Sequence, residues 1–147
     1  DTGVAMARKL HGKGVNLVIV THSAGYKEPN HIELLPENKD MILKYGGKIY
    51  TTTILTHSIE TAFTQKFNGL YPTMIVAQSL RRFGEGIKVC CEIVMEACDG
   101  GLIPELEEVV AVAGTGRGAD TVCIIKSAAS KRFLDLKVLE ILAKPRS

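Results

Sequence analysis

The sequence contains no tryptophan, and its few other aromatic residues make up 5% of its 147 positions. It also lacks a large excess of one charge, because 18 lysines and arginines stand against 16 aspartates and glutamates, for a formal net charge of +2. Proteins that bind nucleic acids usually carry a stripe of basic residues, often with aromatic side chains that stack on bases. Arg81 with Arg82, and Lys131 with Arg132, are only pairs. We therefore expect no nucleic-acid partner.

The four cysteines lack the spacing of a metal site or of a redox motif. No two of Cys90, Cys91, Cys98 and Cys123 form a CxxC pair, and no histidine lies at zinc-finger distance from them. These features favour buried thiols in a reducing compartment and no metal. The sequence has neither a signal peptide nor an apolar run long enough to span a bilayer. It therefore predicts a cytoplasmic protein without a membrane partner.

Helical and extended patterns alternate along the chain, and 46% of the residues are hydrophobic. This length and composition predict one domain over residues 1–147. Glycines, prolines and apolar periodicity predict helices over residues 4–10, from Pro36 to Gly46, from Pro72 to Gly84, and over 87–98. The sequence predicts strands at residues 15–20, 48–55, 109–113 and 121–126, and the apolar, β-branched run at 15–20 is typical of a strand buried on both faces. Residues 134–143 fit either a helix or an edge strand, and we favour the strand.

This alternation is typical of a three-layer αβα sandwich with a mostly parallel sheet. Ligands of such sheets bind beyond the carboxyl ends of the strands. Three polar loops follow predicted strands, at residues 21–25, 56–58 and 114–120. If the strands are parallel, these loops share one edge of the sheet.

Four segments carry a resemblance to a known family: VTHSAGYKEPN, KFNGLYPTMIVAQSLRRFGEGIKVCCEI, AVAGTGRGADT and FLDLKVLEILAKP. They resemble archaeal-type, stand-alone proteins built like the α/β C-terminal domain of pyruvate kinase. The resemblance implies a mixed sheet of about five strands between helices, with the last strand antiparallel at the edge. It implies no kinase activity, because the catalytic barrel is absent. Family members have a helix and a strand before a Thr-Gly turn, and this chain starts at that turn, so we expect an N-terminally truncated domain or another segment in that place.

The candidate ligand-binding residues lie at helix starts and in the polar loops. Thr2 and Gly3 begin a helix whose free amides favour an anion, or form a plain N-terminal cap. Thr21, Ser23 and Gly25 resemble the loop that holds an effector phosphate in pyruvate kinase regulatory domains. The motif Thr-His-Ser occurs twice. Its first copy contains a further candidate, His22, and its second copy contains three. These three are Thr56, His57 and Ser58.

The glycine-rich loop at residues 114–120 matches neither a Walker loop nor a dinucleotide-binding fingerprint. Its glycine spacing differs from that of a Walker loop, and the fingerprint requires a following helix where a strand is predicted. Its glycines expose amides that suit an anion, and Arg117 can form paired bonds to phosphate. The alternative is a tight connection between strands in which Arg117 is solvated. Asp120 binds either Arg117 or a sugar hydroxyl of the ligand, and its alternative role is to cap the turn. The candidates from this loop are Gly114, Thr115, Gly116, Arg117, Gly118 and Asp120.

Two functions follow from these residues. The first is the binding of a phosphorylated small molecule, such as the mononucleotide FMN or a sugar phosphate, in the loops at the carboxyl ends of the strands. The alternative is a small-molecule enzyme in which His22 or His57 acts as acid–base. We favour binding, because no paired-carboxylate, Cys-His or metal-ligand pattern indicates a reaction. The resemblance also implies association into a homo-oligomer.

Overall fold

The computed structural model of the chain describes residues 1–146 and divides into two compact units. Unit 1 is Asp1–Thr53, and unit 2 begins at Ile54. Each unit contains both helices and strands, so the predicted α/β class is confirmed. The expectation of a single domain over residues 1–147 stays a prediction.

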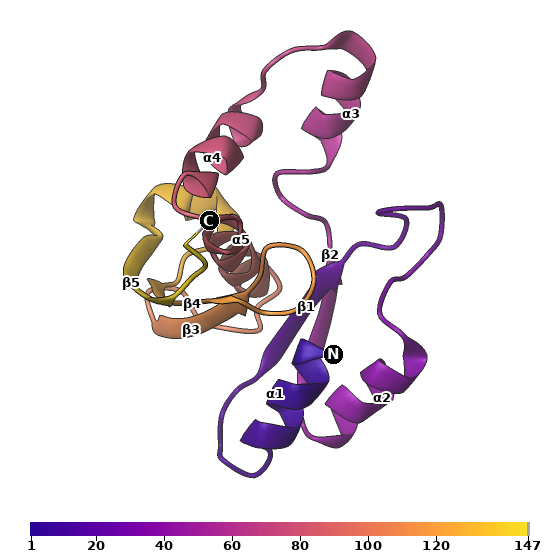
Figure 1. Ribbon diagram of the computed structural model, residues 1–147, viewed down its shortest axis with the longest axis vertical. Coiled ribbons are helices and arrows are strands. Elements are labelled where there is room, and N and C mark those ends of the chain that lie inside the picture. Colours follow the sequence, from indigo (N-terminus) through magenta and orange to yellow (C-terminus); the bar gives the residue numbers. More distant parts are fainter. Residues whose placement is uncertain (147) are drawn as a thin grey trace. The chain divides into compact units, whose positions relative to one another are not determined.

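Unit 1 alternates helices with strands. Its elements are α1 (Thr2–Leu10), β1 (Val18–His22), α2 (Pro36–Lys44) and β2 (Lys48–Thr52). β1 and β2 pair in parallel, with Val18 opposite Lys48 and His22 opposite Thr52. The two helices lie next to each other (Figure 1), and Ala7 and Ile42 are their buried residues. The predicted parallel pairing is therefore confirmed in this unit.

The strand β1 begins and ends later than the expected residues 15–20. The turn after α1 runs to Gly14, which has φ +70°, and the ladder starts only where β2 begins, after Gly47. Thr21 and His22, which we expected in a loop, are consequently the last residues of the strand. The expectation of burial on both faces is also wrong for β1, because most of its residues are half-buried in a sheet with only one other described strand.

Unit 2 opens with three helices: α3 (Ile59–Phe67), α4 (Pro72–Arg81) and α5 (Glu85–Asp99). Pro72 begins α4 and Gly84 precedes α5, as predicted. The sequence analysis did not predict α3. This helix buries none of its residues, and Figure 1 shows it apart from the sheet of its unit.

The sheet of unit 2 contains β3 (Glu108–Ala113), β4 (Thr121–Lys126) and β5 (Lys137–Ala143), with a 3-10 helix, η1 (Ser130–Asp135), before β5. Both strand pairs are antiparallel. The prediction of a mostly parallel sheet is therefore wrong for this unit, because residues 114–120 are too short for the crossover that parallel strands require. β5 confirms the predicted antiparallel edge strand.

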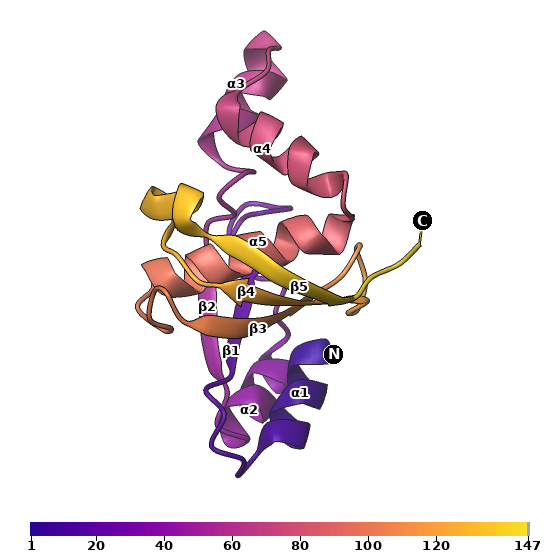
Figure 2. The same cartoon turned by 90° about the vertical axis from the view of Figure 1, so that its left-hand side faces the viewer.

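The core of unit 2 lies between α5 and its sheet (Figure 2). Ile87, Cys91 and Val94, which the helical periodicity placed on one face, are buried there. Cys90 and Cys123 are buried with them, and all four cysteines are free thiols. Burial raises the pKa of the Cys91 thiol to about 12, so it stays protonated at neutral pH. The predicted burial is confirmed for Cys90, Cys91 and Cys123, whereas Cys98 is only partly buried.

Across residues 1–146, the longest apolar stretches in the helices fall short of what crossing a lipid bilayer requires.

Gly86 in α5 provides a test of the packing between α5 and β4. A Cβ atom at this position would lie 2.1 Å from Thr121 Oγ1 and 2.5 Å from Thr121 Cβ. We expect Gly86→Ala to lower the free energy of unfolding by about 1–3 kcal/mol, the usual effect of overpacking, although alanine otherwise favours a helix. Urea denaturation followed by circular dichroism measures this change. Gly116→Ala is the control, because nothing lies within 4 Å of its added Cβ. Equal stability of Gly86→Ala and the wild type would contradict the described packing.

Candidate functional site

The carboxyl ends of β1 and β2 bring polar side chains together in unit 1. Thr21 and Thr51 are opposite each other in the parallel ladder, and their hydroxyl oxygens lie 2.9 Å apart. His22 and Thr52 follow as the last pair of the ladder. This is the edge at which we expected a ligand, and Thr51 was not among the predicted residues.

His22 belongs to a cluster that the sequence analysis missed. Its Nδ1 lies 2.5 Å from Glu33 Oε2, and the other oxygen of Glu33 forms an ion pair with Lys27. The Tyr26 ring packs on the imidazole, with ring centroids 4.4 Å apart. Hydrogen bonds from Lys27 and then from His22 lower the pKa of Glu33, so Glu33 is ionised at neutral pH. Glu33 therefore orients both basic side chains.

Ser23 and Gly25 shape the loop that follows β1. The Gly25 amide donates to His31 O at 2.8 Å, and the Tyr26 amide donates to Ser23 O at 3.2 Å. Gly25 has φ +84°, a conformation that L side chains rarely adopt. The Gly25 amide is thus used within the loop, and its contribution to a ligand stays a prediction.

Thr2 and Gly3 lie in the first turn of α1, as expected. Asp1 stands at the N-cap position, and its side chain makes no capping hydrogen bond. A Cβ atom on Gly3 would lie 3.2 Å from both Ile19 Cγ2 and Ile42 Cδ1. Gly3 therefore has a packing role that the sequence did not indicate, since it lets α1 approach β1 and α2 closely.

The second Thr-His-Ser motif lies in unit 2, between the start of the unit and α3. Thr56 is buried, and its amide and its hydroxyl both donate to Glu92 Oε1, at 2.9 and 2.5 Å. The other oxygen of Glu92 pairs with the buried Lys88. The Thr56 hydroxyl oxygen also lies 3.1 Å from His57 Nδ1. Ser58 is the N-cap residue of α3, and its side chain makes no capping hydrogen bond.

Burial alters the titration of this network. It raises the pKa of Glu96 to about 8, with a further contribution from the neighbouring Glu92 carboxylate. The Leu55 amide donates to Glu96 Oε1 at 3.3 Å. Burial, together with the positive charge of Lys88, lowers the pKa of His57. At neutral pH the network therefore holds a protonated Glu96 and an uncharged His57.

The glycine-rich loop connects β3 to β4 as a hairpin. Asp120 Oδ2 accepts a hydrogen bond from the Thr115 amide at 3.0 Å, and Oδ1 accepts one from the Thr121 hydroxyl at 2.6 Å. Asp120 thus has the turn-capping role that was one of its alternatives. Gly114 is required because a Cβ there would lie 2.0 Å from Gly118 O. Gly116 and Arg117 are exposed at the tip of the loop.

The predicted residues divide between the two units. Thr2, Gly3, Thr21, His22, Ser23 and Gly25 belong to unit 1, and the others to unit 2. Their convergence on one edge stays a prediction. The residues that the sequence analysis missed are charged partners, and in α5 a signal existed, because Lys88, Glu92 and Glu96 recur every fourth residue. Charged residues at this spacing normally lie on the solvent-exposed face of a helix, so the pattern does not by itself predict a buried network.

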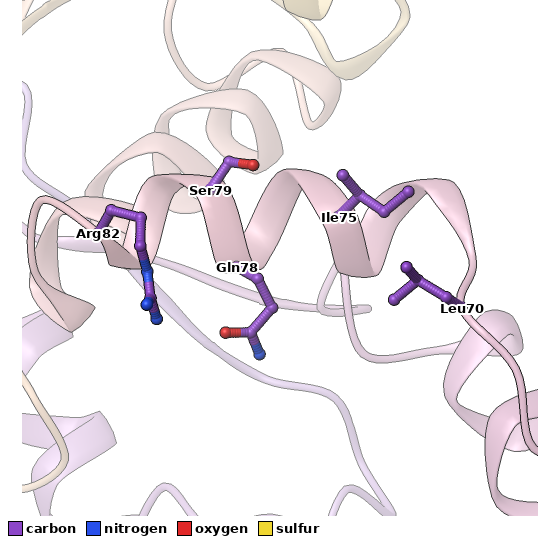
Figure 3. Close-up of a pocket in the computed structure, with 5 residues that line it drawn as sticks. All are labelled: Leu70, Ile75, Gln78, Ser79 and Arg82. Atoms are coloured by element: carbon purple, nitrogen blue, oxygen red, sulfur yellow. The ribbon is translucent and has the colours of Figure 1, made fainter.

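A shallow pocket lies along α4, and none of the predicted residues lines it (Figure 3). Its volume is about 390 Å³, and its lining consists of Leu70, Ile75, Gln78, Ser79 and Arg82. Among residues 1–146, no group of three or more His, Cys, Asp or Glu side chains is arranged to hold a metal ion. A scan of the sequence against protein-family models finds no matching family.

Glu96 provides a test of the buried network through pH. Its pKa lies near 4.5 in the absence of structure and at about 8 when folded, so the folded protein binds the proton more tightly. Stability should therefore fall as the pH rises from about 5 to about 8. Melting temperatures measured across this range should decline less in Glu96→Gln, which keeps the neutral form. Glu140→Gln on the exposed face of β5 should retain the wild-type decline, and an unchanged decline in Glu96→Gln would contradict the burial of Glu96.

Proposed function

We propose that this chain binds the phosphate group of a small molecule at the carboxyl ends of β1 and β2 in unit 1. A mononucleotide such as FMN, or a sugar phosphate, is the class of ligand, and no phosphoryl transfer is involved. The observation that carries the proposal is the pair of hydroxyls of Thr21 and Thr51 at this edge. Parallel strands favour ligands at their carboxyl ends, because side chains and loops from neighbouring strands meet there.

The threonine pair suits a phosphate oxygen. Each hydroxyl has one proton to donate, and the two oxygens lie 2.9 Å apart, where either can be the donor. Phosphate oxygens accept several hydrogen bonds, and those to a charged acceptor are stronger than those between neutral groups. Exchange of the mutual Thr21–Thr51 bond for two bonds to phosphate therefore favours the ligand.

The cluster after β1 contains positive charge within a few residues of Thr21 in the chain. Lys27 uses its ammonium group on Glu33, and an ammonium group has three donors, so further donors remain for an anion. Glu33 has both oxygens bound, one to Lys27 and one to His22. Its charge is thus largely balanced, and it holds the two basic side chains near the last residues of β1.

The first turn of α1 adds to the same edge. Gly3 packs on Ile19, which precedes Thr21 by two residues in β1. Figure 1 shows that α1 runs in the opposite direction to the strands, so its amino end faces the side on which the strands end. The amides and dipole at a helix amino end favour an anion.

The proposal includes the finer features that the sequence patterns and the resemblance predict. These are a three-layer αβα arrangement like the C-terminal domain of pyruvate kinase, a cytoplasmic protein and a homo-oligomer. The parallel pairing of β1 with β2 and the antiparallel position of β5 support the fold. Leu139, Ile141 and Leu142 are exposed on β5, and they support self-association.

Binding to the purified full-length chain tests the proposal. Inorganic phosphate, FMN and glucose 6-phosphate serve as probes in isothermal titration calorimetry. We expect at least one phosphate ester to bind and Thr21→Val to weaken it about tenfold or more, because a hydrogen bond to a charged group contributes roughly 1.5–3 kcal/mol. Lys27→Ala should weaken binding and reduce its dependence on salt.

Arg117→Ala is the matched control, because it removes a cation from the other candidate loop. Its affinity should equal that of the wild type. Loss of binding in Arg117→Ala with full binding in Thr21→Val would move the site to unit 2 and contradict the proposal. No heat of binding for any of the three probes at millimolar concentration would refute it altogether.

A further inference from the structure

The Thr56 hydroxyl determines which nitrogen of His57 carries the proton. A hydroxyl has a single proton to donate. Thr56 gives this proton to Glu92 Oε1, at 2.5 Å. The contact of 3.1 Å between the Thr56 oxygen and His57 Nδ1 can then be a hydrogen bond only if the ring donates it. The uncharged His57 ring therefore carries its proton on Nδ1, and its Nε2 has a free lone pair.

The direction of the Thr56 hydroxyl is itself enforced by the charges around it. Glu92 is 4% exposed and receives the Thr56 amide, the Thr56 hydroxyl and the Lys88 ammonium. Lys88 is 3% exposed, and Glu92 is the partner of its ammonium group. Removing a buried carboxylate from its donors is costly, so the hydroxyl does not rotate away from Glu92. The relay from Lys88 through Glu92 and Thr56 to His57 is thus fixed in one direction.

We propose that His57 is an acid–base residue of a second site, in unit 2, whose Nε2 accepts a proton from an O–H or N–H group of a small molecule. In this step Nε2 takes the proton, the ring becomes an imidazolium, and the negative charge remains on the small molecule. The hydrogen bond from Nδ1–H to the Thr56 oxygen persists throughout. The Glu92 carboxylate, which accepts the Thr56 hydroxyl proton, stabilises the imidazolium. The proton returns from Nε2 when the reaction or the binding step is complete.

The charges that face His57 suit this role. Burial lowers its pKa, and the positive charges of Lys88 in α5 and Arg81 in α4 act in the same direction. Glu92 and Glu85, both in α5, partly oppose them. The ring is consequently uncharged at neutral pH, which is the state in which Nε2 can accept a proton. His57 is only half-buried, so part of the residue is accessible to solvent.

This inference goes beyond phosphate binding and is independent of it, because the threonine pair lies in unit 1 and the relay lies in unit 2. Thr21→Val leaves the relay intact, and Thr56→Val leaves the threonine pair intact. Failure of one proposal therefore leaves the other to stand or fall on its own measurements.

Nuclear magnetic resonance of the full chain, labelled with ¹⁵N at histidine, tests the relay. Long-range ¹H–¹⁵N correlations at pH 7 report which ring nitrogen carries the proton, and His57→Gln assigns the signals. We expect Nδ1–H in the wild type and in Thr56→Ser, which keeps the hydroxyl. Thr56→Val should shift His57 toward Nε2–H. Thr64→Val is the matched control, because the Thr64 hydroxyl donates to Glu60 O within α3. An Nε2–H ring in the wild type would overturn the proposal.

Chemical modification tests whether Nε2 is available, which a purely structural histidine would not require. Diethyl pyrocarbonate transfers an ethoxycarbonyl group to an unprotonated ring nitrogen, and the Nδ1 proton leaves with the ethyl carbonate, which breaks down to ethanol and carbon dioxide. Peptide mass mapping should show His57 modified at pH 7 at a rate at least equal to that of the exposed His31. The rate should fall severalfold in Thr56→Val, with His31 as internal reference. An unreactive His57 in the folded wild type would show that no ligand can reach Nε2 and would also overturn the proposal.

Discussion

The charged face of α5 is the constraint on which unit 2 depends. Lys88, Glu92 and Glu96 lie on successive turns, and all three are buried. Lys88 and Glu92 form an ion pair and Glu96 is protonated at neutral pH, and charged or polar groups removed from water are costly unless partners satisfy them. The segment that opens the unit provides those partners, through the amides of Leu55 and Thr56 and the Thr56 hydroxyl. Its path, and with it the position of His57, is therefore set by the carboxylates, while the opposite face of α5 packs on the sheet.

The two Thr-His-Ser motifs show how identical residues acquire different surroundings. In the first, the Nδ1 of His22 bonds directly to an ionised carboxylate, Glu33, in an exposed loop. In the second, a hydroxyl stands between the carboxylate and the ring of His57, and the network is buried. Both imidazole rings donate from Nδ1, but only that of His57 bonds to a network of buried groups, Thr56 and Glu92, which are shielded from water. The repetition in the sequence made both histidines candidates, whereas the partner carboxylates, Glu33 and Glu92, belong to different segments of the chain.

Local patterns predicted most of the helices and strands, because capping prolines, glycines and apolar periodicity act over a few residues. Pro72, Gly84 and the periodic Ile87, Cys91 and Val94 are examples. Strand direction was predicted less well, since it depends on pairing, although the short connection before Thr121 already excluded a parallel crossover. The residues of the candidate site were predicted least well. Glu33 was not predicted, because nothing in the sequence indicates which group its carboxylate will meet in the fold, and Glu92 was not predicted, because a charged residue that recurs every fourth position is usually solvent-exposed.

A binding site requires donors that the protein has not already used, and this separates the candidate loops. In the glycine-rich hairpin, Asp120 accepts the Thr115 amide, so a carboxylate of the chain itself stands where an anion would bind. At the ends of β1 and β2, the hydroxyls of Thr21 and Thr51 bond to each other, and the proposed ligand would replace that bond. Around His57 the amide and the hydroxyl of Thr56 donate to Glu92, and the proposed relay leaves Nε2 of His57 as an acceptor. The two proposals therefore place an anion and a proton donor in different units.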